Sequence, residues 1–208
     1  MPLDPKREEL VTLATRDIHH PDQITYGEVR PTNVARYKAA RWPVVTDCSG
    51  WYQCLCYAAG LPDPMGTGYA GANRDGCEGF TGTMLSHMLD TTKAACYPGD
   101  AVVFGAFPGV HAAVFLQRGN AADPTMGSNG TPGDPTEMPL SRLVAGFPGK
   151  PVTYLKLAEP DVFTQRWKVR DMRGRLIATT EHPAIWSARH TSVFRDHGLV
   201  GFYKEVPK

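Results

Sequence analysis

The chain has 208 residues, of which 42% are hydrophobic and 21% are charged, with a formal net charge of +1. These values are typical of a soluble globular protein, and the near-neutral charge gives no electrostatic footprint for nucleic acid. No run approaches the roughly 18 apolar residues that cross a membrane, and the charged N-terminus lacks the apolar core of a secretory signal. We expect a monomer with one main domain and a small appendage.

Apolar periodicity predicts most elements of residues 1–157. We expect helices over residues 4–16, 51–59 and 83–89, strands over 101–104, 111–116 and 152–155, and glycine-rich and proline-rich loops over 62–82 and 123–139. The strands over 101–104 and 111–116 are separated by a short Gly/Pro turn. They should therefore be adjacent and antiparallel.

The character of the sequence changes after residue 157. Residues 167–171 alternate in polarity, a turn follows, and residues 176–178 resume the pattern, which predicts a hairpin. A short helix over 183–197 and a last strand over 199–206 are expected to follow. A segment of about 50 residues is small for an independent core. We therefore expect residues 158–208 to form a small module beside a domain of residues 1–157.

The cysteine content indicates a reduced protein rather than a disulfide scaffold. The number of cysteines is odd, so complete pairing within the chain leaves one free: they are Cys48, Cys54, Cys56, Cys77 and Cys96. A zinc site is the alternative. However, Cys54 and Cys56 are two residues apart in an expected helix, where their side chains diverge, and no C-x-x-C pair is present. We expect both to pack in the core as small hydrophobic groups.

Cys48 differs from these because its neighbours, Asp47, Ser49 and Gly50, are typical of a helix start rather than of a core. A helix N-terminus lowers the pKa of a thiol, and the thiolate is the nucleophile of cysteine chemistry. Further along the chain, His111 opens an apolar strand and could return a proton to a leaving amine. This order predicts a thiol hydrolase. A buried thiol and a structural histidine are the alternatives.

Three segments, taken together and in order, resemble the NlpC-type papain-like peptidoglycan peptidases, particularly phage-encoded members from actinobacterial hosts. They are residues 47–50 (Asp-Cys-Ser-Gly), 98–104 (Pro-Gly-Asp-Ala-Val-Val-Phe) and 111–115 (His-Ala-Ala-Val-Phe). The resemblance spans residues 24–155. It implies an α+β, papain-like fold in which N-terminal helices pack on a central antiparallel sheet, with a small β-rich appendage at the C-terminus.

The resemblance also implies a catalytic triad. Cys48 would be the nucleophile and His111 the base, with a third polar residue on the following strand to orient the imidazole. Asn129 lies where phage relatives carry a histidine, and an amide oxygen could serve this purpose. Asp123 and Gln117 are the alternatives, and a plain turn role for Asn129 remains open.

Three further residues are implied to surround the substrate. The hydroxyl of Tyr26, with the backbone N–H of Cys48, would bind the oxyanion, although the glycine pair that usually follows this tyrosine is missing. Simple packing is the alternative for Tyr26. Asp47 and Ser49 would contact substrate. Capping of the helix is the alternative for Asp47.

The implied reaction is hydrolysis of an amide bond in the peptidoglycan stem, between D-γ-glutamate and the diamino acid, without a metal or organic cofactor. An N-acetylmuramoyl-L-alanine amidase and a catalytically inert wall-binding protein are the alternatives. The implied partner is bacterial peptidoglycan, with neither nucleic acid nor membrane. The protein would be made in the host cytoplasm without a signal peptide, and would act as an endolysin or be carried in the virion. Residues 158–208 would bind the wall or pack on the catalytic domain.

Overall fold

A computed structural model describes residues 3–30, 32–66, 79–130, 135–157, 167–170, 176–180 and 201–204. The chain divides into two compact units, Met1–Leu157 and Ala158–Lys208. Each unit is described by itself.

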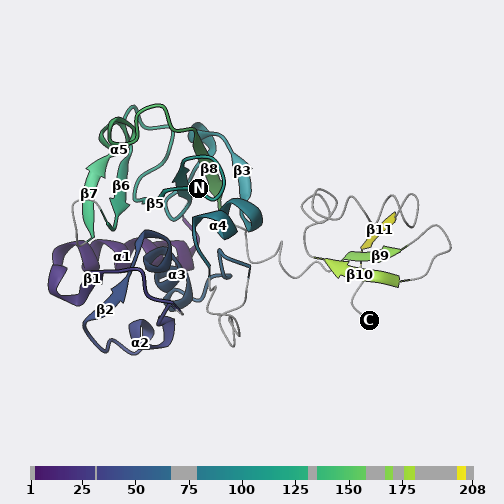
Figure 1. Cartoon of the computed structure of the whole chain (residues 1–208), viewed down its shortest axis with the longest axis horizontal. Coiled ribbons are helices and arrows are strands. Elements are labelled where there is room, and N and C mark those ends of the chain that lie inside the picture. The colour runs from purple at the N-terminus through teal and green to yellow at the C-terminus, as the bar shows by residue number, and fades with distance from the viewer. Residues whose placement is uncertain are drawn as a thin grey trace. The chain divides into compact units, whose positions relative to one another are not determined.

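The helices of the first unit surround a central sheet (Figure 1). Those described are α1 (Pro5–His19), α2 (Val34–Lys38), α3 (Cys48–Ala58), α4 (Thr81–His87) and α5 (Leu140–Gly146), with the short 3-10 helices η1 (Pro21–Gln23) and η2 (Lys93–Ala95). No described helix combines the length and the apolar character that a membrane crossing needs.

The central sheet is antiparallel throughout and has the order β3-β8-β4-β5-β6-β7. Its strands are β3 (Leu89–Thr91), β4 (Ala101–Phe104), β5 (His111–Phe115), β6 (Thr125–Ser128), β7 (Thr136–Pro139) and β8 (Val152–Lys156). A separate pair, β1 (Ile24–Tyr26) and β2 (Val44–Thr46), is parallel. The first unit is therefore mixed α+β with a central antiparallel sheet, as the sequence predicts.

Two sequence expectations about this sheet have different outcomes. The strands over 101–104 and 111–116 are confirmed as adjacent and antiparallel, with Phe104 opposite His111. The expected loop over residues 123–139 is wrong, because it contains β6 and β7, which pair with each other. Their composition is unusual for strands. Backbone hydrogen bonds to the long central strand β5 supply the pairing that local propensity does not indicate.

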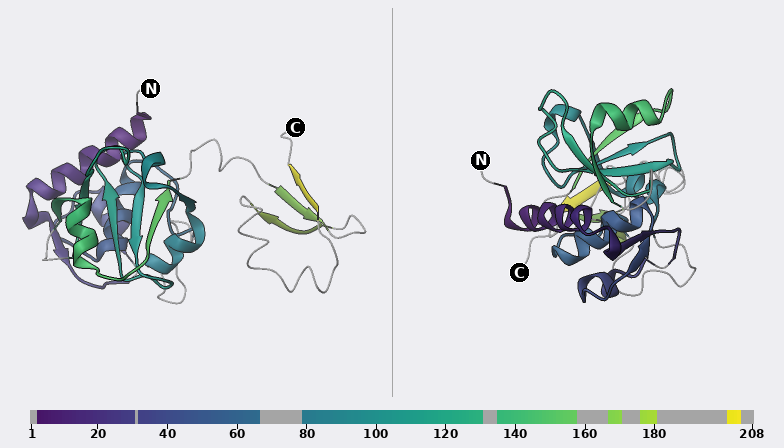
Figure 2. Two further views of the ribbon diagram at one scale, coloured as in Figure 1. Left: turned by 90° about the horizontal axis from the view of Figure 1, so that it is seen from above. Right: turned by 90° about the vertical axis from the view of Figure 1, so that its left-hand side faces the viewer.

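The two faces of the sheet are covered by different helices (Figure 2). On one face, Trp51 of α3 belongs to a buried cluster with Ala112 and Val114 of β5. On the other, Phe115 belongs to a second cluster with Leu143 of α5. The side chains of β5 thus alternate between the two cores, as a strand dictates.

The Pro-Gly-Asp turn before β4 is fixed by a buried ion pair. Arg7 Nη1 of α1 donates to Asp100 Oδ1 at 2.8 Å, and the same oxygen accepts the backbone N–H of Leu157 at 2.8 Å. Burial raises the pKa of Asp100, while Arg7 opposes that shift. The aspartate of this motif therefore ties α1 and the end of the first unit to the sheet.

The described part of the second unit is an antiparallel sheet of the order β10-β9-β11. Its strands are β9 (Trp167–Arg170), β10 (Leu176–Thr180) and β11 (Gly201–Lys204). The predicted hairpin and the last strand are confirmed, with β9 in the centre. The expected helix over 183–197 lies outside the described residues.

Candidate functional site

Cys48 is the first residue of α3, and Asp47 caps this helix. Asp47 has an extended backbone, and its Oδ1 accepts the N–H of Gly50 at 2.7 Å. A Cβ at position 50 would collide with Thr46 Oγ1, so a glycine is required there. The capping interpretation of Asp47 is confirmed, and α3 starts earlier than the apolar pattern indicates.

The thiol of Cys48 is almost buried, with 7% of the residue exposed. The backbone N–H groups of Ala112 and Ser49 hydrogen-bond to its sulfur and lower its pKa. Burial first, and then the Asp47 carboxylate, outweigh them and raise the pKa to about 11. The amide at the helix N-terminus lowers the pKa as expected, but the net shift is upward, because desolvation of the thiolate costs more than the two amides return.

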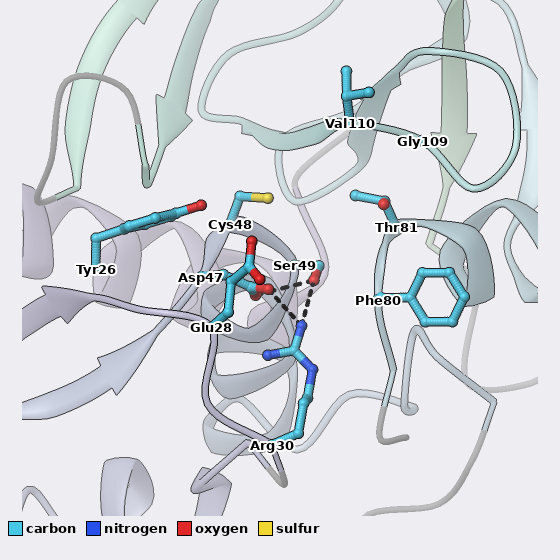
Figure 3. A pocket seen from close by; sticks show the side chains of 10 residues that line it. All are labelled: Tyr26, Glu28, Arg30, Asp47, Cys48, Ser49, Phe80, Thr81, Gly109 and Val110. Carbon is cyan, nitrogen blue, oxygen red and sulfur yellow. Dashed lines mark hydrogen bonds and ion pairs between the residues drawn. The ribbon is translucent and has the colours of Figure 1, made fainter. Parts of the chain in front are cut away.

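Cys48 borders a pocket of about 420 Å³, and its sulfur points into that pocket (Figure 3). The wall comes from four segments that the sequence separates: the stretch from β1 to α2, the start of α3, the start of α4 and the β4–β5 turn. The lining residues are Tyr26, Glu28, Arg30, Asp47, Cys48, Ser49, Phe80, Thr81, Gly109 and Val110. Three residues that the sequence predicts near Cys48, namely Tyr26, Asp47 and Ser49, are among them.

Arg30 is a pocket residue that the sequence does not reveal. Its Nη2 donates to Asp47 Oδ2 at 2.5 Å and to Ser49 Oγ at 3.2 Å (Figure 3). Its Nε donates to the Gly79 carbonyl at 2.9 Å. It therefore pairs the charge of Asp47 and holds the Asp-Cys-Ser segment from the pocket side. An isolated arginine in a loop carries no signal for such a role in the sequence.

Tyr26 reaches the pocket because β1 runs parallel to β2, which places Tyr26 opposite Thr46, just before the cysteine segment. The residue is 42% exposed, and its hydroxyl points toward Cys48 (Figure 3). Partial burial, and then Cys48 and Asp47, raise the pKa of Tyr26. The hydroxyl therefore keeps its proton at neutral pH and can donate a hydrogen bond in the pocket.

His111 opens β5 and lies in an aromatic environment. Its ring stacks against Phe147 and Phe104, with centroids 5.1 and 6.2 Å away. Its Nε2 shares a hydrogen bond of 2.8 Å with Ser128 Oγ. Burial lowers the pKa of His111 to about 4, against the opposing effect of the Asp47 carboxylate. The imidazole is therefore neutral at neutral pH.

Cys48 is hydrogen-bonded to the backbone of β5 next to His111, and not to the His111 side chain, among the described residues. The N–H that binds the Cys48 sulfur belongs to Ala112, the residue after His111. Alternation along β5 turns the His111 ring toward the cluster that contains Phe104 and Phe115. Within the described residues, no hydrogen bond links the Cys48 sulfur to the imidazole. The described contacts therefore link Cys48 to the backbone of β5 and not to the imidazole, and both side chains are uncharged.

Asn129 forms no hydrogen bond with the imidazole in the described part of the chain, contrary to the prediction. Its Nδ2 donates to the carbonyls of Thr46 and Asp47, at 3.0 and 3.2 Å, and its buried Oδ1 accepts no hydrogen bond in the described part of the chain. Ser128, the last residue of β6, holds His111 instead, because it lies opposite Ala113, whose side chain shares a face of β5 with that of His111. The sequence cannot identify Ser128 without the strand register.

The two alternatives for the third residue have structural roles of their own. Asp123 accepts the backbone N–H and the hydroxyl of Ser141 at the start of α5, at 2.9 and 2.6 Å. Gln117 Oε1 accepts the N–H of Thr125 at 3.3 Å. Neither carboxyl nor amide is hydrogen-bonded to His111.

The remaining described cysteines pack in the interior. Cys54 and Cys56 are fully buried in the α3 core, as expected, and Cys96 is buried on the other face of the sheet. Burial raises the pKa of each thiol. Cys77 lies outside the described residues. Among the residues that the structure describes, no group of three or more His, Cys, Asp or Glu side chains is placed to hold a metal ion.

Comparisons with known proteins give no match to this chain. No family model matches it, and neither a curated protein nor a solved structure does so.

Proposed function

We propose that the first unit is a papain-like cysteine peptidase of the NlpC type that hydrolyses an amide bond in the peptidoglycan stem peptide. One observation supports this most: the Cys48 thiol opens a helix, points into a pocket and touches the strand that begins with His111. The other described cysteines lie in the core, where no substrate reaches them.

The chemistry starts from two neutral groups. Cys48 has a raised pKa and His111 a lowered one, so the resting pair is thiol and imidazole rather than an ion pair. Attack on a carbonyl carbon then requires the imidazole to accept the thiol proton as the sulfur–carbon bond forms. His111 returns that proton to the leaving amine, and water hydrolyses the thioester. Hydrogen bonds between catalytic groups often tighten only when substrate binds.

The pocket supplies donors for the developing oxyanion. The Tyr26 hydroxyl is protonated and points toward Cys48, and the backbone N–H of Cys48 is at the start of α3. Each donor in such a position is worth about 3 kcal/mol of transition-state stabilisation. We infer the bond between D-γ-glutamate and the diamino acid from the resemblance of residues 24–155 to the NlpC-type family, and a role as an endolysin or virion-borne lysin from the same source.

A catalytically inert wall-binding protein is the second candidate, and two observations favour it. The thiol pKa of about 11 leaves little thiolate at neutral pH, and no described hydrogen bond joins Cys48 to His111. On this proposal the scaffold would bind peptidoglycan without cutting it.

The two candidates are distinguished by digestion of purified peptidoglycan with the full chain, followed by mass spectrometry of the soluble fragments. The peptidase proposal expects stem-peptide fragments, while a free stem with an N-terminal L-alanine would identify the amidase reaction. Iodoacetamide should stop the reaction by modifying Cys48, and EDTA should not affect it. Wall binding without any fragment would support the inert candidate, and loss of activity in EDTA that zinc restores would contradict the thiol mechanism.

A further inference from the structure

Two consecutive residues at the end of β6 form hydrogen bonds with His111 and with the segment before Cys48. Ser128 is fully buried and shares a 2.8 Å hydrogen bond with His111 Nε2. Asn129, also fully buried, donates to the carbonyls of Thr46 and Asp47, which directly precede Cys48. β6 ends at Ser128, and the chain bends at Asn129, so the two side chains bind different segments.

We propose that these two residues divide the positioning of the catalytic pair, which rests on the proposed peptidase function. Ser128 orients the imidazole of His111, and Asn129 holds the backbone that presents Cys48. This assignment moves the third residue of the triad from Asn129 to Ser128, and gives Asn129 a separate partner, the cysteine segment.

The hydrogen-bonding capacity of each group supports the division. The two carbonyls that face Asn129 can only accept, so both N–H bonds of its amide nitrogen are used there and its oxygen faces away. The Ser128 hydroxyl can accept from Nε2–H, which leaves Nδ1 as the unprotonated nitrogen of the neutral imidazole. A base needs that lone pair to accept the thiol proton.

Gly130, the residue after Asn129, lies against a third residue of the site, Tyr26. Gly130 has a φ of 118°, and a Cβ there would collide with the ring of Tyr26. The sequence Ser128-Asn129-Gly130 therefore contacts, in turn, the histidine, the cysteine segment and the tyrosine of the pocket. Only glycine allows Tyr26 to lie this close.

The division is tested with Ser128→Ala and Asn129→Ala in the full chain, using two readouts that need no turnover. Nitrogen NMR of the His111 ring reports which nitrogen carries the proton, and the rate of iodoacetamide alkylation reports access to Cys48. In the parent we expect the proton on Nε2. Ser128→Ala should redistribute it between the two nitrogens, and Ser128→Thr, which keeps a hydroxyl, should restore it.

Asn129→Ala should leave the His111 spectrum unchanged and affect the cysteine instead. Release of the Thr46 and Asp47 carbonyls should expose the sulfur, so alkylation becomes faster while turnover becomes slower. Ser128→Ala should lower kcat about tenfold or more with little change in KM, since a fixed imidazole matters in the chemical step.

Three results would overturn the division: a proton on Nδ1 in the parent, an unchanged His111 spectrum in Ser128→Ala, or a His111 spectrum altered equally by Asn129→Ala. Retained thermal unfolding midpoints in both variants would show that the readouts report local changes. If the parent releases no wall fragments, the peptidase proposal fails, while the NMR and alkylation results still decide the division.

Discussion

The two faces of the central sheet place the thiol and the imidazole in different environments. The α3 side presents Cys48 to a polar pocket, next to the Asp47–Arg30 ion pair. The α5 side encloses His111 between Phe104 and Phe147, with Ser128 as its hydrogen-bond partner. Burial drives both groups to their neutral forms, and the Asp47 carboxylate raises the pKa of both. For the thiol the carboxylate therefore adds to the effect of burial, whereas for the imidazole it opposes it.

The largest effect is expected from the thiol itself. Cys48→Ala should abolish wall cleavage and leave the fold intact, because alanine suits a helix start and the backbone amides remain. Cys54→Ala, on the same helix but in its core, should keep activity and cost about 1–2 kcal/mol of unfolding free energy from the lost contacts and the small cavity. Wall digestion and chemical unfolding measure both. Cleavage by the Cys48 variant would refute the thiol mechanism.

Protonation of His111 should control the stability of the fold at acid pH. Burial lowers the pKa of His111 from 6.5 to about 4, so the unfolded state binds more protons between these values. The contribution of His111 to the free energy of unfolding is then fully present above pH 6.5. It falls by roughly 3 kcal/mol as the pH drops toward 4.

His111→Gln is the matched variant, because glutamine still offers a polar group to Ser128 but does not titrate. Unfolding in urea at about pH 7 and about pH 4.5 measures the difference. The parent should lose more stability than the variant over this interval. An equal loss in both would mean that His111 is not the group responsible.

The pKa of the Cys48 thiol should depend on the charged residues of the pocket. Asp47 raises the pKa of the Cys48 thiol and Arg30 lowers it, so Asp47→Asn and Arg30→Met should shift that pKa down and up, respectively. Asparagine still caps a helix, which isolates the charge. The pH dependence of iodoacetamide alkylation measures both shifts. Shifts of the same sign in the two variants would contradict this electrostatic account.

The smallest effect is expected at Asp123, the alternative to Asn129 in the sequence analysis. This exposed carboxyl holds the start of α5 through Ser141, away from the imidazole. Asp123→Ala should slightly lower the unfolding temperature and leave turnover unchanged. A collapse of activity comparable to that of Ser128→Ala would reopen its assignment to the catalytic group.

The sequence pattern is sufficient to predict a helix or strand where the segment's own residues favour it. The apolar runs at β4, β5 and β8 and the capping residues before Cys48 indicate their structures directly. The strands β6 and β7 were hidden by glycine and proline, since only the hydrogen bonds of neighbouring strands make them extended. The pocket residue Arg30 was hidden for a related reason, because its partners Asp47 and Gly79 are distant in sequence.

The sequence by itself determined the two candidate catalytic residues, their order along the chain and the α+β class. The tertiary structure decided what surrounds them: that Ser128 rather than Asn129 holds His111, that Asn129 binds the cysteine segment, and that the thiol pKa is raised. The physical reason is that side-chain direction in a strand depends on register, and a pKa depends on burial. Both are fixed only when distant segments pack together.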